Sequence, residues 1–178
     1  MIPTTVCELW RYLVKSLLGE RGEHFSLDQR GMIGDRLYAV RDEAGKFGSG
    51  KPTRHFRRID GLFRCRAVYN GGVPLITFSD ASTLRGDDPA IHEALTAHLG
   101  LSATLSREAD ISHLDAGQVH ILTTASLRPL RTLGASWLAG SGDRAEAALD
   151  ECRFPPNVLV ETGAEGFPEC AGKAATSP

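Results

Sequence analysis

The chain has 178 residues, a length typical of a single domain or of two small subdomains that share a core. Its 20 Lys and Arg residues against 22 Asp and Glu residues give a formal net charge of −2, which excludes the strong basic excess that non-specific nucleic-acid binding requires. Hydrophobic residues make up 42% and charged residues 24%, a composition that excludes a disordered chain.

Strands and turns are expected over roughly the first seventy residues. Leu37 to Val40 is a short run that favours a strand, and the polar stretch 41–45 suits a chain reversal. Residues 62–69 alternate in the manner of a strand with one buried face. Asn70-Gly71-Gly72 predicts a hairpin turn, because Asn and Gly accept the positive φ that it requires. Residues 73–78 would return as an edge strand, since their second residue is a proline.

One helix is clearly indicated in the middle of the chain. Asp87 or Asp88 can cap it, Pro89 fits its first turn and Gly100 ends it. Its apolar residues recur every four positions and predict one buried stripe, made of Ile91, Leu95 and Leu99.

The elements expected in the second half are short. In chain order they are a strand at 119–122, a helix from Ser126 with Pro129 in its first turn, an alanine-rich helix at 143–149, a closing strand at 157–160 and a disordered tail at 170–178. Together with the first half they predict a mainly β protein with a few helices, of the α+β class.

The cysteines lie far apart and form no CxxC pair; they are Cys7, Cys65, Cys152 and Cys170. No signal peptide is expected at the short, non-basic start, so we interpret them as reduced thiols of a cytoplasmic protein. No apolar stretch is long enough to span a bilayer, so we expect no membrane association. The six histidines lack the tight spacing of zinc ligands, so structural or surface roles are expected for them.

The stretch from Gly45 to Lys51 fits the GxxxxGK pattern of a phosphate-binding loop. That loop requires a hydroxyl residue after the Lys and a helix after the loop. Here Pro52 follows the Lys, and residues 53–60 lack helical periodicity. The stretch is therefore interpreted as a basic hairpin loop rather than a nucleotide site.

Three polar clusters stand at the ends of expected strands. They are Lys15 with Ser16, Gly34-Asp35-Arg36, and the segment from Arg153 to Asn157. Such positions allow side chains from different loops to converge on one ligand, and their Lys, Arg, Ser and Asn donors favour an anion. Surface salt bridges and turn chemistry are the alternative interpretation of the same residues.

In this order the clusters resemble motifs of the MOSC family, the domain at the C-terminus of molybdenum cofactor sulfurases, and most closely its amidoxime-reducing type. The similar segments span residues 6–168 and are Leu13-Val14-Lys15-Ser16, Gly31-Met32-Ile33-Gly34-Asp35-Arg36, Leu122-Thr123-Thr124-Ala125-Ser126-Leu127 and Arg153-Phe154-Pro155-Pro156-Asn157-Val158. The resemblance implies a MOSC-type β-barrel, with an N-terminal β-rich subdomain at 1–80, a partial barrel domain at 81–169 and a tail at 170–178.

The resemblance also implies a cofactor, molybdenum-molybdopterin, and residues that hold it. Lys15, Ser16 and Arg36 would contact the phosphate and pterin, and Asn157 would hold the pterin edge. A separate flavin or iron–sulfur reductase would supply electrons for the reduction of N-hydroxylated compounds, because this chain has no cluster-binding cysteine pattern. Members of the family are also associated with pyridoxal phosphate binding.

The chain departs from the family pattern at two places. Pro155 replaces a second arginine, and the chain ends before the cysteine that ligates molybdenum in the family, so no metal ligand is assigned. Cys152, five residues before Asn157, is the candidate for a substitute thiolate, and a packed, inert thiol is the alternative interpretation. We therefore expect an incomplete barrel, either partly open or with its edge covered by a second copy in a homodimer. Two functions stay open: a molybdenum-dependent oxidoreductase, and a non-catalytic module that binds pterin or a sulfur carrier.

Overall fold

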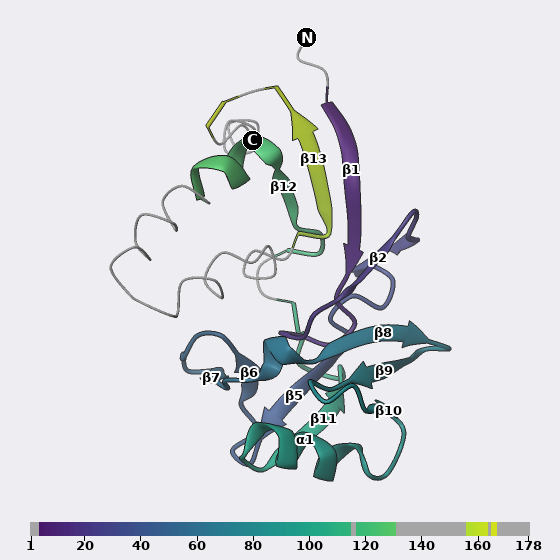
Figure 1. Ribbon diagram of the computed structural model, residues 1–178, viewed down its shortest axis with the longest axis vertical. Coiled ribbons are helices and arrows are strands. Elements are labelled where there is room, and N and C mark those ends of the chain that lie inside the picture. The colour runs from purple at the N-terminus through teal and green to yellow at the C-terminus, as the bar shows by residue number, and fades with distance from the viewer. Residues whose placement is uncertain (1–3, 115–116, 131–155, 164, 167–178) are drawn as a thin grey trace. The chain divides into compact units, whose positions relative to one another are not determined.

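The computed structural model describes residues 4–114, 117–130, 156–163 and 165–166 (Figure 1). They fall into two compact units. The terminal unit comprises residues 1–10, 22–24 and 119–178, and the central unit comprises residues 11–21 and 25–118. The described chain is mainly β with two short helices, as the composition and pattern predict, and its sheets are open and mixed.

The central unit contains two sheets and a small two-stranded pair. One sheet has the order β11-β5-β6-β7, with bounds Ala103–Arg107, Tyr38–Asp42, Phe47–Ser49 and Phe56–Arg58. The other has the order β10-β9-β8, with bounds Thr83–Arg85, Val73–Thr77 and Arg66–Asn70. The pair joins β3 (Leu27–Asp28) and β4 (Gly31–Met32), and the 3-10 helix η1 covers Leu62–Arg64.

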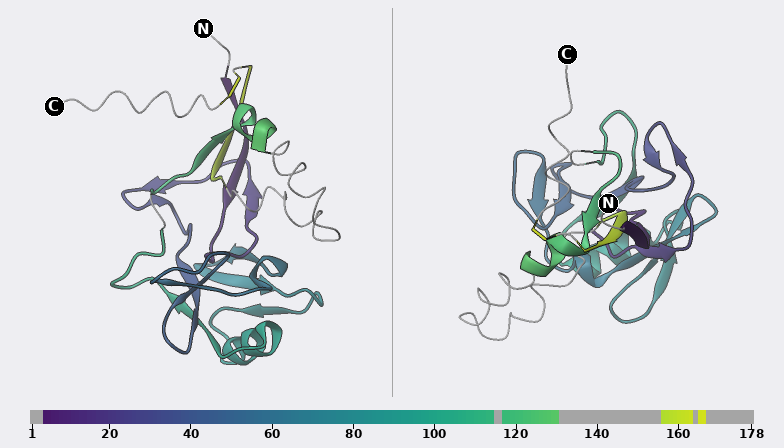
Figure 2. Two further views of the ribbon diagram at one scale, coloured as in Figure 1. Left: turned by 90° about the vertical axis from the view of Figure 1, so that its left-hand side faces the viewer. Right: turned by 90° about the horizontal axis from the view of Figure 1, so that it is seen from above.

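The core of the central unit forms around helix α1 (Ile91–Leu99), which lies along β11 (Figures 1 and 2). Ile91 and Leu95 are fully buried and Leu99 packs against the same cluster, which confirms the predicted stripe. Gly100 ends the helix with a φ of 68°, a left-handed conformation that glycine adopts without steric cost.

The terminal unit contributes β12, β13 and nearly all of β1 to a four-stranded sheet in the order β12-β13-β1-β2. The bounds of these strands are Ile121–Thr123, Val158–Thr162, Thr4–Arg11 and Glu20–Gly22. Strands β12 and β13 are parallel, whereas β13 and β1 are antiparallel. A small apolar cluster of Leu122, Leu127 and Leu159 covers one face, with Leu127 contributed by the helix at residues 124–130.

The predicted hairpin forms between β8 and β9, with Asn70 paired to Val73 and positive φ at Gly71 and Gly72. The expected edge position of the returning strand is wrong, because β9 lies between β8 and β10. Its proline is tolerated there since β10 pairs only with residues 75–77, so the missing N–H of Pro74 leaves no gap in that ladder.

Two other predicted elements differ from the structure. Residues 62–64 form η1 rather than the start of a strand, which leaves Phe63 exposed while Cys65 and Ala67 are buried as expected. The helix expected from Ser126 begins at residue 124, because the Thr123 hydroxyl oxygen accepts a hydrogen bond from the Ser126 N–H at 3.1 Å and caps it. Pro129 therefore lies beyond the first turn.

No closed barrel is formed by the residues that the structure describes, and the four sheets are open. The expected helix at 143–149, the tail at 170–178 and Cys152 lie outside the described residues. Within the described ranges, no helix is long and apolar enough to cross a membrane.

The centre of the GxxxxGK stretch forms a strand rather than a phosphate loop. Residues Phe47–Ser49 form the fully buried strand β6, and no helix follows it before η1 in this part of the chain. A Cβ at Gly48 would lie 2.9 Å from Leu62 Cδ1 and 3.1 Å from Ile59 Cδ1. The glycine therefore serves close packing.

We expect Gly48→Ala to lower the free energy of unfolding by about 1–3 kcal/mol, because the added methyl overpacks a closed core. Gly50→Ala is the matched control, since a Cβ there meets only Phe63, at 3.5 Å. Urea unfolding followed by circular dichroism measures both. Equal losses for the two variants would contradict the packing role of Gly48.

Candidate functional site

The structure divides the four predicted binding residues between the two units. Lys15, Ser16 and Arg36 belong to the central unit, and Asn157 belongs to the terminal unit. Each group is therefore described by itself.

Lys15 is buried directly after an anchored segment. The preceding residues Leu13 and Val14 have no exposed surface, and the Lys15 N–H donates to the carbonyl of Tyr38 at 2.8 Å. Only 3% of Lys15 is exposed, and its Nζ donates to the backbone carbonyl of His113 at 3.0 Å. The Nζ also lies 4.9 Å from the ring centre of Phe56, a cation–π distance. A lysine charge is therefore held in place by packing and by a backbone acceptor.

Ser16 and Arg36 hold an unusual backbone conformation. Their φ angles are 65° and 49°, and among the described residues only one other non-glycine residue, Ala81, has a positive φ. Such a conformation costs on the order of 1–3 kcal/mol in a residue with a side chain, and it persists only where the surroundings enforce it. Strain of this kind is concentrated at ligand sites.

The loop that carries Arg36 is bound to the segment that carries Lys15. The Arg36 N–H donates to the Tyr12 carbonyl at 2.7 Å, and the Tyr12 N–H donates to Asp35 Oδ1 at 2.8 Å. Asp35 is fully buried, and its second carboxylate oxygen pairs with the Arg36 guanidinium. These reciprocal bonds bring two of the predicted sequence motifs together in one unit.

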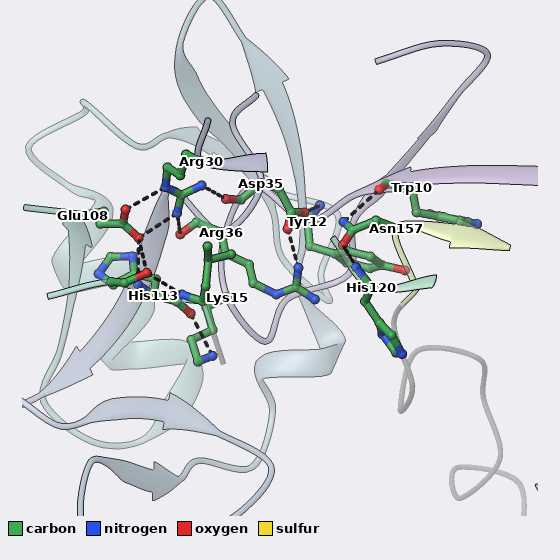
Figure 3. A network of polar contacts seen from close by, with 12 residues as sticks. Trp10, Tyr12, Lys15, Arg30, Asp35, Arg36, Glu108, His113, His120 and Asn157 are labelled. Atoms are coloured by element: carbon green, nitrogen blue, oxygen red, sulfur yellow. Dashed lines mark hydrogen bonds and ion pairs between the residues drawn. The ribbon is translucent and has the colours of Figure 1, made fainter. Parts of the chain in front are cut away.

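A further ion pair, which the sequence motifs do not indicate, lies beside this loop (Figure 3). Arg30 donates from Nε and Nη2 to the two carboxylate oxygens of Glu108, each at 2.6 Å. The bond with Arg30 lowers the pKa of Glu108 to about 2, and the bond with Glu108 raises the pKa of Arg30. Arg30 stands one residue before the Gly31–Arg36 motif, but 78 residues separate it from Glu108, so no local pattern could have revealed the pair.

His113 connects this ion pair to Lys15. Its backbone N–H donates to Glu108 Oε2 at 2.7 Å, while its carbonyl accepts the bond from Lys15. The imidazole is buried and packs edge-on against Phe47 at 5.0 Å between ring centres. Burial lowers the pKa of His113, so the ring is neutral at pH 7.

Asn157 holds strands together in the terminal unit. Its side chain is fully buried; Oδ1 accepts from the His120 N–H at 2.9 Å and Nδ2 donates to the Trp10 carbonyl at 3.3 Å. Its backbone is bonded to the same two residues. The Asn157 N–H donates to the His120 carbonyl, and the Asn157 carbonyl accepts from the Trp10 N–H. These contacts give the residue a structural role, and its predicted contact with a pterin stays a prediction.

The described cysteines differ in environment. Cys65 is buried in the central unit, and desolvation raises the pKa of its thiol to about 11, so it is protonated at neutral pH. Cys7 belongs to the terminal unit, where its Sγ donates to the Leu159 carbonyl at 3.4 Å. Among the described residues, no three His, Cys, Asp or Glu side chains converge as metal ligands. Cys152, the predicted thiolate, lies outside these residues.

Comparison with known proteins found no matching family model, and neither curated proteins nor solved structures gave a match.

The depressed pKa of Glu108 predicts acid sensitivity. Because the folded pKa is below the ordinary value of 4.5, the stability that this carboxylate contributes is present above pH 4.5 and is lost as the pH falls toward about 2. We expect Glu108→Gln to lose about 2 kcal/mol at pH 7 and to show a shallower decline in stability over that interval.

Urea unfolding of the wild type and of Glu108→Gln across this pH range measures the difference in their free energies of unfolding. Asp87→Asn is the control, because Asp87 pairs with Arg85 at the exposed surface. A Glu108→Gln curve that runs parallel to the wild-type curve would contradict the prediction.

Proposed function

We propose that this protein binds a phosphate-bearing ligand of the molybdopterin type through Lys15, Ser16 and Arg36. The observation that carries the proposal is the strained backbone of Ser16 and Arg36, enforced beside a buried lysine. These residues are also the ones that resemble the MOSC motifs. The proposal rests on the central unit alone.

The donor set fits the phosphate end of such a ligand. Lys15 and Arg36 are cations, and charge-assisted hydrogen bonds to phosphate oxygens are among the stronger ones in proteins. Ser16 adds a hydroxyl donor with directional preference. Pairing with Asp35 and stacking at 5.5 Å from the Tyr12 ring orient the Arg36 guanidinium, so less rotational freedom is lost on binding.

Molybdenum, when bound, would supply oxygen-atom transfer or reduction of N-hydroxylated compounds, with electrons from a separate flavin or iron–sulfur reductase. The contribution of the described residues is to bind and orient the phosphate, not to carry the redox step.

Expression in a host that makes the molybdenum cofactor tests the proposal. We expect about one molybdenum per chain by elemental mass spectrometry, accompanied by pterin fluorescence after denaturation. Pterin without molybdenum would favour a binding module over an oxidoreductase. Neither pterin nor molybdenum in the purified protein would contradict the proposal.

Substitution of Arg36 tests the assigned contact. We expect Arg36→Ala to weaken binding of inorganic phosphate by about 1.5–3 kcal/mol, or roughly 10- to 150-fold, because a charge-assisted hydrogen bond is removed. Isothermal titration calorimetry on the full chain measures it. Arg85→Ala is the control, since Arg85 pairs with Asp87 in an exposed turn. Unchanged affinity in Arg36→Ala would show that Arg36 does not contact the anion.

A further inference from the structure

We propose that Arg30 and Glu108 act together as a positioning pair, and that this half-buried ion pair fixes the positions of Lys15 and Arg36, the two cations of the candidate anion site. This inference rests on the proposed function, and it assigns a role to residues that do not themselves contact the ligand.

The first half of the argument concerns Arg30 and the backbone of the Arg36 loop. Arg30 Nη1 donates to the carbonyl of Asp35, and Nη2 donates to the carbonyl of Arg36 at 3.2 Å. One guanidinium thus holds two successive peptide groups, at the point where φ of Arg36 becomes positive. A strained peptide keeps its conformation only where several bonds determine it, and Arg30 supplies two of them.

The second half concerns Glu108 and Lys15. The Glu108 carboxylate accepts a hydrogen bond from the His113 N–H at 2.7 Å. The His113 carbonyl in turn accepts a hydrogen bond from Lys15 Nζ at 3.0 Å. The position of the lysine charge therefore depends on a backbone segment that the carboxylate holds. Figure 3 shows the continuous series of bonds from Lys15 through His113, Glu108 and Arg30 to Asp35 and Arg36.

The geometry requires an arginine at the centre of this network. Arg30 makes two bonds to Glu108 and two to backbone carbonyls, and a planar guanidinium with five N–H groups can direct donors along both edges at once. A lysine would keep the charge but present a single nitrogen. A glutamine at position 108 would keep the shape but lose the charge that strengthens its bonds.

A second ion pair in the same unit provides a matched control. Arg11 donates to Glu20 at 2.7 Å, with 14% and 19% of the two side chains exposed, against 26% and 14% for Arg30 and Glu108. Arg11 also donates to a backbone carbonyl, that of Ile33. It thus matches Arg30 in chemistry and burial, but its carbonyl contact lies outside the strained Asp35–Arg36 peptides.

The test compares Arg30→Lys, Glu108→Gln and the control Arg11→Lys in the full chain. Two quantities are measured: the dissociation constant for inorganic phosphate by calorimetry, and amide hydrogen exchange at Arg36 and His113 by NMR. We expect Arg30→Lys and Glu108→Gln each to weaken phosphate binding roughly tenfold, as the loss of residues that orient a ligand-binding group does elsewhere. Arg30→Lys would accelerate exchange mainly at Arg36, and Glu108→Gln mainly at His113. Arg11→Lys would change neither quantity.

A charge swap separates positioning from stability. Arg30→Glu combined with Glu108→Arg restores an ion pair but leaves the Asp35 and Arg36 carbonyls without the Arg30 donors. Positioning predicts that phosphate affinity does not recover, even where the new ion pair restores part of the thermal stability. Recovery of both, or an effect of Arg30→Lys no larger than that of Arg11→Lys, would overturn the inference.

Failure of the proposed function gives a different pattern. If the wild-type chain binds no phosphate, the anion site is wrong, and hydrogen exchange alone then decides the positioning role. Faster exchange at Arg36 and His113 in the respective variants supports it, and unchanged exchange at both positions overturns it.

Discussion

Burial of charge is the constraint on which the central unit depends. Lys15 is 3% exposed and Asp35 is fully buried, and an ion removed from water is tolerated only when other groups replace its hydration. Asp35 receives the Tyr12 N–H and the Arg36 guanidinium, and Lys15 is bonded to a backbone carbonyl and faces Phe56. A buried ion pair adds little net stability compared with apolar packing, but breaking one is costly. The arrangement therefore determines one specific geometry for these loops.

Loops at the site are held by single backbone bonds and by side chains rather than by strand ladders. In strand pairing, segment 12–18 forms only isolated bridges, to Tyr38 and Arg66, and residues 33–36 form a turn. Their remaining bonds are single backbone bonds, such as that from the Arg36 N–H to the Tyr12 carbonyl, and side-chain bonds made by the buried Asp35 and by Arg30. Because these bonds are directional, they can hold Arg36 at positive φ, which a ladder of regular strand geometry could not, while Ser16 takes its positive φ in the turn closed by the Leu17 N–H and the Val14 carbonyl. Precision at the candidate site thus follows from the polar network beneath it.

The sequence predicted elements whose signals are local and missed relations that depend on distant partners. The Asn70-Gly71 hairpin and the end of the helix at Gly100 formed as expected, because turn and cap residues act on their immediate neighbours. The predicted cap at Asp87 or Asp88 is wrong, because the N-cap is Ala90 and Pro89 precedes the helix. The predicted edge position of β9 was wrong because β10 pairs with the free side of β9, and no residue within β9 specifies that pairing. Lys15 and Arg36 carried recognisable motifs, whereas Glu108 is defined only by folding against Arg30.

The two phosphate-binding hypotheses raised by the sequence use different physical means. A GxxxxGK loop binds through consecutive backbone N–H groups, and such a loop needs glycines that leave the backbone open to the ligand. Here Gly48 brings the backbone of β6 against Leu62 and Ile59, so its small size is used for packing. The Lys15 and Arg36 site would instead bind through side-chain charges from two loops. Affinity at such a site depends on how rigidly those loops are held, which makes the Arg30–Glu108 pair the natural determinant of its strength.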